Sequence, residues 1–178
     1  LKTVGRQADA ITAYRKALAL SPTLGEVWWS LANLKTLKFD ENDIAAMRDA
    51  LDTDAIAAED RFHLHFALGK AQEDRGQAAE AFDHYATGNA LRKRLLESAV
   101  PFYQRLAVQK PGDAPREAAR GRACRRLGEL RMQIGELEQA LADFEQTRSI
   151  FAKLAADFPT TPEYREGLAA GQMNLGAV

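Results

Sequence analysis

The amino-acid sequence predicts an all-α protein built from antiparallel helix hairpins. Alanine, leucine and charged residues dominate the 178-residue chain, whereas β-branched residues are sparse, and this composition favours helix almost everywhere. Glycines, aromatic residues and prolines also recur at similar spacings, which is typical of helical repeats. In such repeats each hairpin buries its apolar face only by packing on its neighbours.

Residues 1–24 match the second half of one helix–turn–helix unit. Gly5 is expected at the turn, and Ala10 at a small position where the paired helices approach closely. Tyr14 is expected to fill the space between the helices, and Pro22 to end the unit. The first helix of this unit is missing, so we expect a truncated unit.

Residues 25–58 begin the second unit, in which two tryptophans stand side by side in EVWWSLANLK. Adjacent helical residues point about 100° apart, so the two rings face different surroundings. Trp28 occupies the position that packs between paired helices and is predicted in the core, whereas Trp29 is predicted on the concave face. The following turn lacks the usual glycine, and either Asp40 or Asn42 can cap the next helix.

The third unit shows the recurring glycine and aromatic positions most clearly. Gly69 follows a leucine in HFALGKAQEDRG, Gly76 is expected at the turn, and Tyr85 follows at the aromatic position. One long helix is then predicted over residues 77–110. Pro101 must kink or interrupt this helix, because proline removes a backbone donor and clashes with the preceding turn.

After residue 95 the repeat lengthens to 48 residues. This spacing separates Leu106 from Leu154, Pro111 from Pro159, Leu127 from Leu175 and Gly128 from Gly176. Thr161 and Pro162 predict the start of the last helix, as its N-cap and first helical residue. Because that helix stops just after its Leu-Gly pair, we expect a second truncated unit and self-association through an exposed end.

This pattern of recurring glycine, aromatic and proline positions resembles the tetratricopeptide repeat (TPR), a 34-residue unit. The resemblance implies a right-handed superhelix, a TPR-like solenoid, whose concave groove holds extended peptides. Residues 1–94 resemble the repeats of bacterial TPR sulfotransferases in WWSLANLKTLKF, HLHFALGKAQEDRG and AFDHYATGNALRKR. Residues 102–178 resemble repeat arrays of bacterial Ser/Thr kinases, most clearly in FAKLAADFPTTPEYREGLAAGQMNLG.

Neither resemblance brings catalytic residues with it. The sequence contains no phosphate-cradling loop of a sulfotransferase and no Gly-rich loop, HRD or DFG of a kinase, so we expect no enzyme. The halves 1–94 and 95–178 share the long helix near 77–110, which suggests a chimera spliced through that helix. A natural divergent array is the main alternative.

The candidate groove residues combine aromatic rings, amides and cations. By position in their units they are Trp29, Asn33, Phe66, Lys70, Arg122, Arg125, Arg126 and Asn174. Such a surface suits a peptide, since amides pair with its backbone, cations with a carboxylate and rings with an apolar side chain. The alternative is that Trp29 and Phe66 pack on each other or on a neighbouring helix.

These residues predict a non-catalytic scaffold that binds a protein or peptide. One alternative is the docking arm of a sulfotransferase that lacks its catalytic domain. Another is an engineered chimeric repeat protein with no native ligand.

The charge distribution bears on the class of partner. Acidic residues dominate 40–60 and basic residues dominate 105–131, which indicates either two solvated helix faces or a basic lobe that attracts an acidic partner. The net charge of −1 predicts no general attraction to nucleic acid or to membranes, and the arginine cluster lacks interleaved aromatics and a nucleic-acid-binding motif.

Three features of the sequence bear on localisation. No apolar run approaches the roughly 20 residues that span a bilayer, and no secretory signal is visible. The single cysteine, Cys124, excludes an internal disulfide and fits a reducing compartment, so a cytoplasmic protein is expected.

No cofactor and no metal site are expected. His63 and His65 are two residues apart on a helix and point in divergent directions. Glu80 and His84 have i, i+4 spacing but lack companions. Cys124 has no nearby histidine in the sequence and is predicted to be a small buried apolar group.

Overall fold

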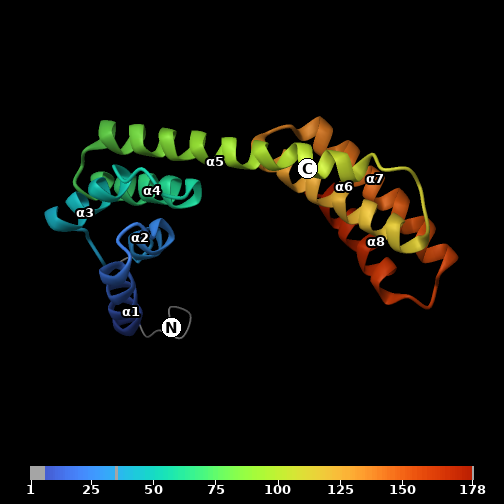
Figure 1. The fold of residues 1–178 in the computed structure, drawn as a ribbon, viewed down its shortest axis with the longest axis horizontal. Helices are drawn as coiled ribbons and strands as arrows, with labels where there is room; N and C mark the ends of the chain where they lie inside the picture. Colours follow the sequence, from blue (N-terminus) through green and yellow to red (C-terminus); the bar gives the residue numbers. More distant parts are fainter. Residues whose placement is uncertain (1–6, 35, 178) are drawn as a thin grey trace. The chain divides into compact units, whose positions relative to one another are not determined.

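A computed structural model describes residues 7–34 and 36–177, and these residues form helices and no strand. The predicted all-α class is confirmed. The helices are α1 (Gln7–Leu20), α2 (Gly25–Ala32), α3 (Glu41–Leu51), α4 (Ala58–Asp74), α5 (Ala78–Ala107), α6 (Ala114–Ile134), α7 (Leu137–Asp157) and α8 (Pro162–Leu175) (Figure 1). Gly5, the expected first turn, lies outside the described residues. The chain divides into unit 1 (Leu1–Leu95) and unit 2 (Leu96–Val178), each with its own core.

Unit 1 is built on the pairing of α2 with α4. Helix α1 packs on α2, α3 packs on α4, and the first part of α5 lies along α4 (Figure 1). Trp28 is only 3% exposed and its indole Nε1 donates to the Pro22 carbonyl oxygen at 2.9 Å. The prediction that Trp28 belongs to the core is therefore confirmed. Leu31, Leu64 and Leu68 surround it in the same apolar cluster.

Asp40, rather than Asn42, caps helix α3. Its carboxylate accepts from the Asp43 backbone N–H at 2.9 Å, and the Asp43 carboxylate accepts from the Asp40 N–H at 3.3 Å. This reciprocal pair satisfies two donors that a helix start leaves without partners. Asp43 also accepts two hydrogen bonds from the Arg15 guanidinium, which joins α1 to α3.

Two hairpins, α4–α5 and α6–α7, turn in the same way. Gly76 and Gly135 adopt φ values of 74° and 90°, in the left-handed region that suits glycine. The residue after each glycine donates back into the preceding helix, from Gln77 to the Gln72 carbonyl at 2.9 Å and from Glu136 to the Arg131 carbonyl at 2.8 Å. Both helices thus end in a Schellman motif.

A glycine also lies under an aromatic ring in each of these hairpins. A Cβ atom placed on Gly69 would lie 2.7 Å from the ring of Tyr85, and one on Gly128 would lie 2.6 Å from the ring of Phe144. Both distances are too short for real Cβ contacts. The absence of a side chain therefore lets each pair of helices approach closely.

Helix α5 is the expected long helix with shorter ends, and Pro101 does not interrupt it. It begins at Ala78, ends at Ala107 and continues through Pro101 without interruption. The division between the two units falls within this helix, between residues 95 and 96.

Unit 2 contains the second part of α5 with α6, α7 and α8. Helix α7 packs against both α6 and α8. Phe144 and Phe151 are among its largest fully buried side chains, and Cys124 is 0% exposed, as predicted. The last helix begins at Pro162 as expected, although the Thr161 side chain makes no capping hydrogen bond.

Candidate functional site

The rings of Trp29 and Phe66 meet where α2 packs along α4. Their centroids are 5.5 Å apart with an angle of 48° between the planes, and both side chains are half-buried. The alternative that these two rings pack on each other is therefore the observed arrangement. Because neither ring is fully covered, the pair still forms part of the surface.

An aromatic cavity opens beside this ring pair. It has a volume of about 510 Å³ and lies within unit 1, and we call it the Trp29 cavity. Its lining residues are Trp29 from α2, Phe62, His63 and Phe66 from α4, and Tyr85 and Arg92 from α5. The Tyr85 hydroxyl donates to the Glu73 carboxylate at 2.8 Å, which fixes the position of that ring. The cavity therefore offers mainly flat apolar surface with polar atoms at its border.

A smaller, more polar cavity lies further along the same two helices. We call it the Lys70 cavity, and its volume is about 310 Å³. Asn33 and Lys38 line it from the segment after α2, and Lys70 and Asp74 line it from α4. The Asn33 side-chain nitrogen donates to the Trp29 carbonyl oxygen at 2.9 Å, and the Lys70 ammonium donates to Asp74 at 2.7 Å. The lysine charge is thus balanced within its own helix.

The structure therefore brings four of the predicted groove residues together. Trp29 and Asn33 are four residues apart on one chain segment, and Phe66 and Lys70 are four apart on α4, so each pair follows one helical face. We call these four residues the α2–α4 groove. One turn of helix, about 6 Å, separates its aromatic end from its polar end.

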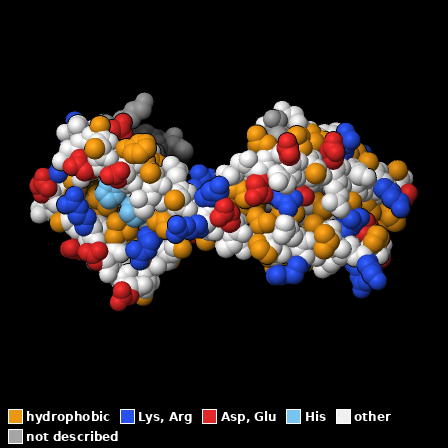
Figure 2. All heavy atoms as spheres, turned by 90° about the horizontal axis from the view of Figure 1, so that it is seen from above, with side chains coloured by type: hydrophobic (Ala, Val, Ile, Leu, Met, Phe, Trp, Pro, Cys, Tyr) orange, Lys and Arg blue, Asp and Glu red, His pale blue; other side chains and the backbone are white. Residues whose placement is uncertain are grey.

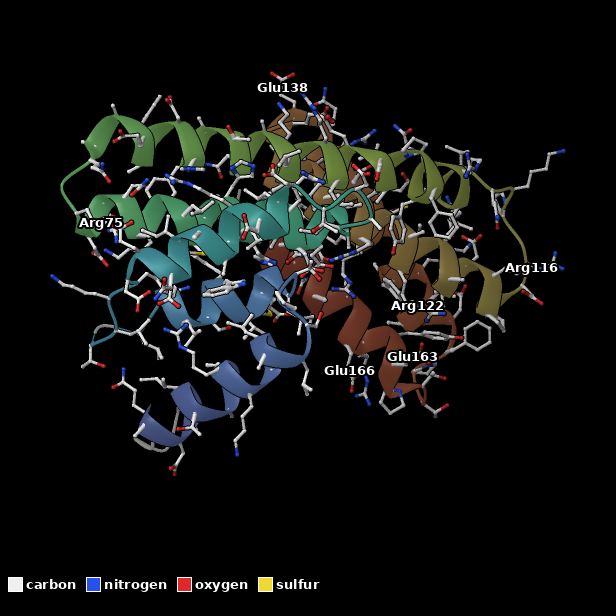
Figure 3. All side chains as sticks on the ribbon, turned by 60° about the vertical axis from the view of Figure 1, so that its left-hand side comes forward. Arg75, Arg116, Arg122, Glu138, Glu163 and Glu166 are labelled. Atoms are coloured by element: carbon white, nitrogen blue, oxygen red, sulfur yellow. The ribbon has the colours of Figure 1, made fainter. Side chains whose placement is uncertain are left out.

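The arginines predicted in unit 2 are paired with carboxylates of this chain. Arg122 on α6 meets Glu163 on α8 at 2.6 Å (Figure 3). Arg125 and Arg126 both reach Glu129, at 2.6 and 3.1 Å. Arg122 and Arg125 also line a cavity of about 300 Å³ between α6 and α8. These ion pairs favour the interpretation of the basic stretch as a solvated, charge-balanced face.

Asn174 is not part of the same cavity as these arginines. It is half-buried on α8, and its side-chain nitrogen is buried with no hydrogen-bond partner among the described residues. The neighbouring Met173 is 75% exposed. Self-association through this end of the chain stays a prediction.

The sequence reasoning missed a contact between two histidines. The Nδ1 atoms of His65 on α4 and His84 on α5 are 3.0 Å apart. The sequence pattern relates each histidine only to a residue of its own helix, as the i, i+2 pair His63 and His65 and the i, i+4 pair Glu80 and His84. One signal could have revealed the pairing: His65 stands in the third unit where Trp28 stands in the second, and that position packs between paired helices.

The described parts of the chain show neither a metal-ligand cluster nor a membrane-spanning helix. Within residues 7–34 and 36–177, no three histidine, cysteine, aspartate or glutamate side chains gather as metal ligands. In the same residues, no helix has the length and apolar character needed to cross a membrane. Burial raises the pKa of the Cys124 thiol to about 11, so this cysteine is not a thiolate nucleophile at neutral pH.

Comparisons with known proteins give no match to this chain among protein-family models, curated proteins or solved structures. The α2–α4 groove is accordingly interpreted from its own geometry.

Proposed function

We propose that this chain is a non-catalytic scaffold that binds a protein or peptide segment in the α2–α4 groove. The observation that carries the proposal is the alignment of two different cavities along one pair of helices. The ring pair of Trp29 and Phe66 borders an aromatic cavity, and Asn33 and Lys70 line a polar cavity one turn away.

The spacing of the two cavities suits an extended peptide. Side chains two residues apart in an extended strand lie on one face, about 7 Å from each other. One of them can enter the Trp29 cavity, where burying a leucine or phenylalanine side chain contributes about 1.5–3 kcal/mol. The other reaches the Lys70 cavity, where the side-chain amide oxygen of Asn33 is an acceptor for a peptide N–H.

Charge favours a neutral or weakly acidic segment at the polar end. Lys38 and Lys70 line the Lys70 cavity together with Asp74. Since Lys70 also contacts Glu73 and Asp74, its attraction to a ligand carboxylate is reduced. We therefore expect apolar burial to supply most of the affinity.

The finer architecture is part of the same proposal. We propose that the hairpins stack as a TPR-like superhelix. The repeated combination of a left-handed turn glycine with a glycine under an aromatic ring supports it, because the combination occurs at Gly76 and Gly69 and again at Gly135 and Gly128.

A displayed peptide library tests the proposal. The full chain is used to select binders, and their affinities are measured by calorimetry against Trp29→Ala, Phe66→Ala and Phe82→Ala variants. Phe82 is the matched control, because it is an aromatic side chain on α5 that is 71% exposed and does not line the Trp29 cavity.

The first two variants are expected to weaken binding by about 10- to 100-fold, as truncation of a buried aromatic anchor does, and Phe82→Ala by less than about 3-fold. Selection of no peptide that depends on Trp29 would contradict the proposal. That result would favour the alternative of a chimeric repeat protein with no native ligand.

A further inference from the structure

His65 and His84 form a direct hydrogen bond between α4 and α5. Their Nδ1 atoms are 3.0 Å apart, and the ring centroids are 5.3 Å apart. An imidazole nitrogen lies one ring radius from the centre of its ring. The centroid separation is about the N···N distance plus one such radius for each ring, which is possible only if both Nδ1 atoms lie close to the line that joins the two ring centres. The two Nδ1 atoms therefore point at each other, as in an N–H···N hydrogen bond and unlike two ligands that converge on a metal ion.

Close helix contacts lie on both sides of this histidine pair. Gly69 on α4 leaves room for the Tyr85 ring, and Gly88 on α5 leaves room for the Phe66 ring, where an added Cβ would lie 2.8 Å away. Helices α4 and α5 therefore approach closely on both sides of the histidine pair, which keeps the two half-buried rings within hydrogen-bond distance.

The hydrogen bond requires two different neutral tautomers. One ring must donate its Nδ1–H, and the other must accept at a bare Nδ1 while carrying its proton on Nε2. A single added proton can bind the donor ring at Nε2 and leave the bond intact. With two added protons, both Nδ1 atoms carry hydrogen and face each other, so the bond is lost and two like charges repel.

The charged groups around the pair disfavour protonation. Arg48 on α3 acts on His84, Arg61 on α4 acts on His65, and Asp83 on α5 opposes Arg48 at His84. Burial, followed by the effects of His84 and Arg61, lowers the pKa of His65 to about 4. Burial and Arg48 also lower the pKa of His84. Figure 2 shows histidine atoms at the surface of unit 1 beside lysine and arginine side chains.

We infer that His65 and His84 form a proton-sensitive joint, which holds α4 against α5 while the pair is neutral and releases it when both rings are protonated. The device is specific to unit 1, where all three histidines of the chain lie. It does not depend on any ligand.

The direction of the pH effect follows from linkage. The pKa of His65 lies near 6.5 in the unfolded chain and near 4 in the folded one, so the unfolded chain binds more protons between these values. The stabilising effect is complete above about pH 6.5 and is lost as the pH falls toward 4. For His65 alone, the unfolding equilibrium constant rises by about 30-fold between pH 8 and pH 5.

A consequence for binding rests on the proposed function. His65 precedes Phe66 and His84 precedes Tyr85, and both of these aromatic residues line the Trp29 cavity. Release of the joint separates the walls of that cavity, so peptide affinity falls only when both rings become protonated in the folded chain, at about pH 4 and below. The tests of the joint itself are made without peptide, so that a failure of the binding proposal leaves them interpretable.

The first test is nitrogen-15 NMR of the imidazole rings in the full chain at pH 7.5. The expected spectra show one ring of the pair as the Nδ1–H tautomer and the other as the Nε2–H tautomer, and neither titrates near pH 6.5. Two Nε2–H tautomers, or ordinary titration of both rings, would overturn the inference.

The second test is urea unfolding from pH 8 to pH 5, followed by tryptophan fluorescence, because Trp28 and Trp29 both report on unit 1. The double variant His65→Gln/His84→Gln is compared with His63→Gln, the remaining histidine. The double variant is expected to lose the roughly 30-fold change, whereas His63→Gln retains it. An unchanged pH dependence in the double variant would refute the joint.

Discussion

Gly128 is the residue at which the α6–α7 hairpin depends most on the absence of a side chain. A Cβ there would lie 2.6 Å from the ring of Phe144, which is 0% exposed and has no free space to move into. The better helix propensity of alanine is worth about 1 kcal/mol, and the overpacking costs about 1–3 kcal/mol. Gly128→Ala is therefore expected to lower the free energy of unfolding by up to about 2 kcal/mol, measured by urea denaturation.

Gly176 provides the matched control for this substitution. A Cβ at Gly176 would meet its nearest atom at 3.6 Å, an ordinary van der Waals distance. Gly176→Ala should change stability by less than about 0.5 kcal/mol. Equal effects of the two substitutions would show that the glycine–aromatic contact does not determine how closely α6 and α7 approach.

The ion pair between Arg131 and Asp143 is the most buried one described in unit 2. The two groups meet at 2.7 Å with side chains 15% and 9% exposed, and burial raises the pKa of Asp143 even though Arg131 opposes this change. Arg131→Met leaves that carboxylate without its cation, so a loss of about 3 kcal/mol is expected at pH 8.

This loss should be smaller at pH 5. In the Arg131→Met variant, the pKa of Asp143 in the folded chain is raised further, because the neighbouring cation is gone. Asp143 then binds a proton on folding, and the penalty for burying its charge becomes smaller as the pH falls. Chemical denaturation at both pH values measures the difference. Arg122→Met, which removes an exposed pair with Glu163, should cost under about 1 kcal/mol at either pH. The same loss at pH 5 and pH 8 for Arg131→Met would argue against a buried, uncompensated carboxylate.

At the scale of elements, α5 contains a proline that is unfavourable in a helix interior. Pro101 is exposed and lies inside the continuous helix Ala78–Ala107, where it removes one backbone donor. Pro101→Ala is expected to stabilise this part of α5 by about 1–3 kcal/mol. Amide hydrogen exchange over residues 96–107 should slow, whereas Gln104→Ala, at another exposed position of the helix, should leave it nearly unchanged. Faster exchange in Pro101→Ala would mean that the proline ring itself stabilises the segment.

Helix boundaries were the most predictable feature of these elements, because their signals are local. The α3 cap, narrowed by the sequence to Asp40 or Asn42, the Gly76 turn and the start of α8 at Pro162 each depend on residues within a few positions. The ends of α5, which lie inside the expected range 77–110, were predicted less closely. The burial of Trp28 followed equally from its place in a repeated pattern. Contacts between helices were harder to predict from the sequence, because they depend on how each helix is rotated about its axis against its neighbour.

The candidate site shows the same contrast. The sequence placed the four residues of the α2–α4 groove on one face by position alone, and the structure brings them together, while their role in binding stays a prediction. The hydrogen bond between His65 and His84 could not, because nineteen residues and a turn separate them. The pairing of Arg122 with Glu163 was also missed, and it favours the solvated, charge-balanced face over the attractive basic lobe, the two interpretations that the sequence left open.

At the scale of the whole molecule, two core clusters formed by the described residues share no residue. One contains Leu64 and lies entirely in unit 1, whereas the other contains Leu127 and lies entirely in unit 2. We therefore expect two unfolding transitions. Tryptophan fluorescence follows only unit 1, because both tryptophans lie there, and circular dichroism follows the helices of both units.

Core substitutions assign the two transitions. Leu64→Ala should cost about 2–5 kcal/mol and move the fluorescence transition, whereas Phe144→Ala should cost about 3–5 kcal/mol and move only the circular dichroism transition. Both side chains are 0% exposed, which makes the pair well matched. Coincident transitions that shift together in both variants would show that the units unfold as one.

The most direct measurement for the proposed groove uses the indole N–H signals of the two tryptophans. A selected peptide is titrated into the nitrogen-15-labelled chain and both signals are followed by NMR. The Trp29 signal is expected to shift, because its ring borders the Trp29 cavity, while the Trp28 signal stays in place, because its N–H is bonded to Pro22 inside the core. A bound peptide that leaves the Trp29 signal unmoved would contradict the account.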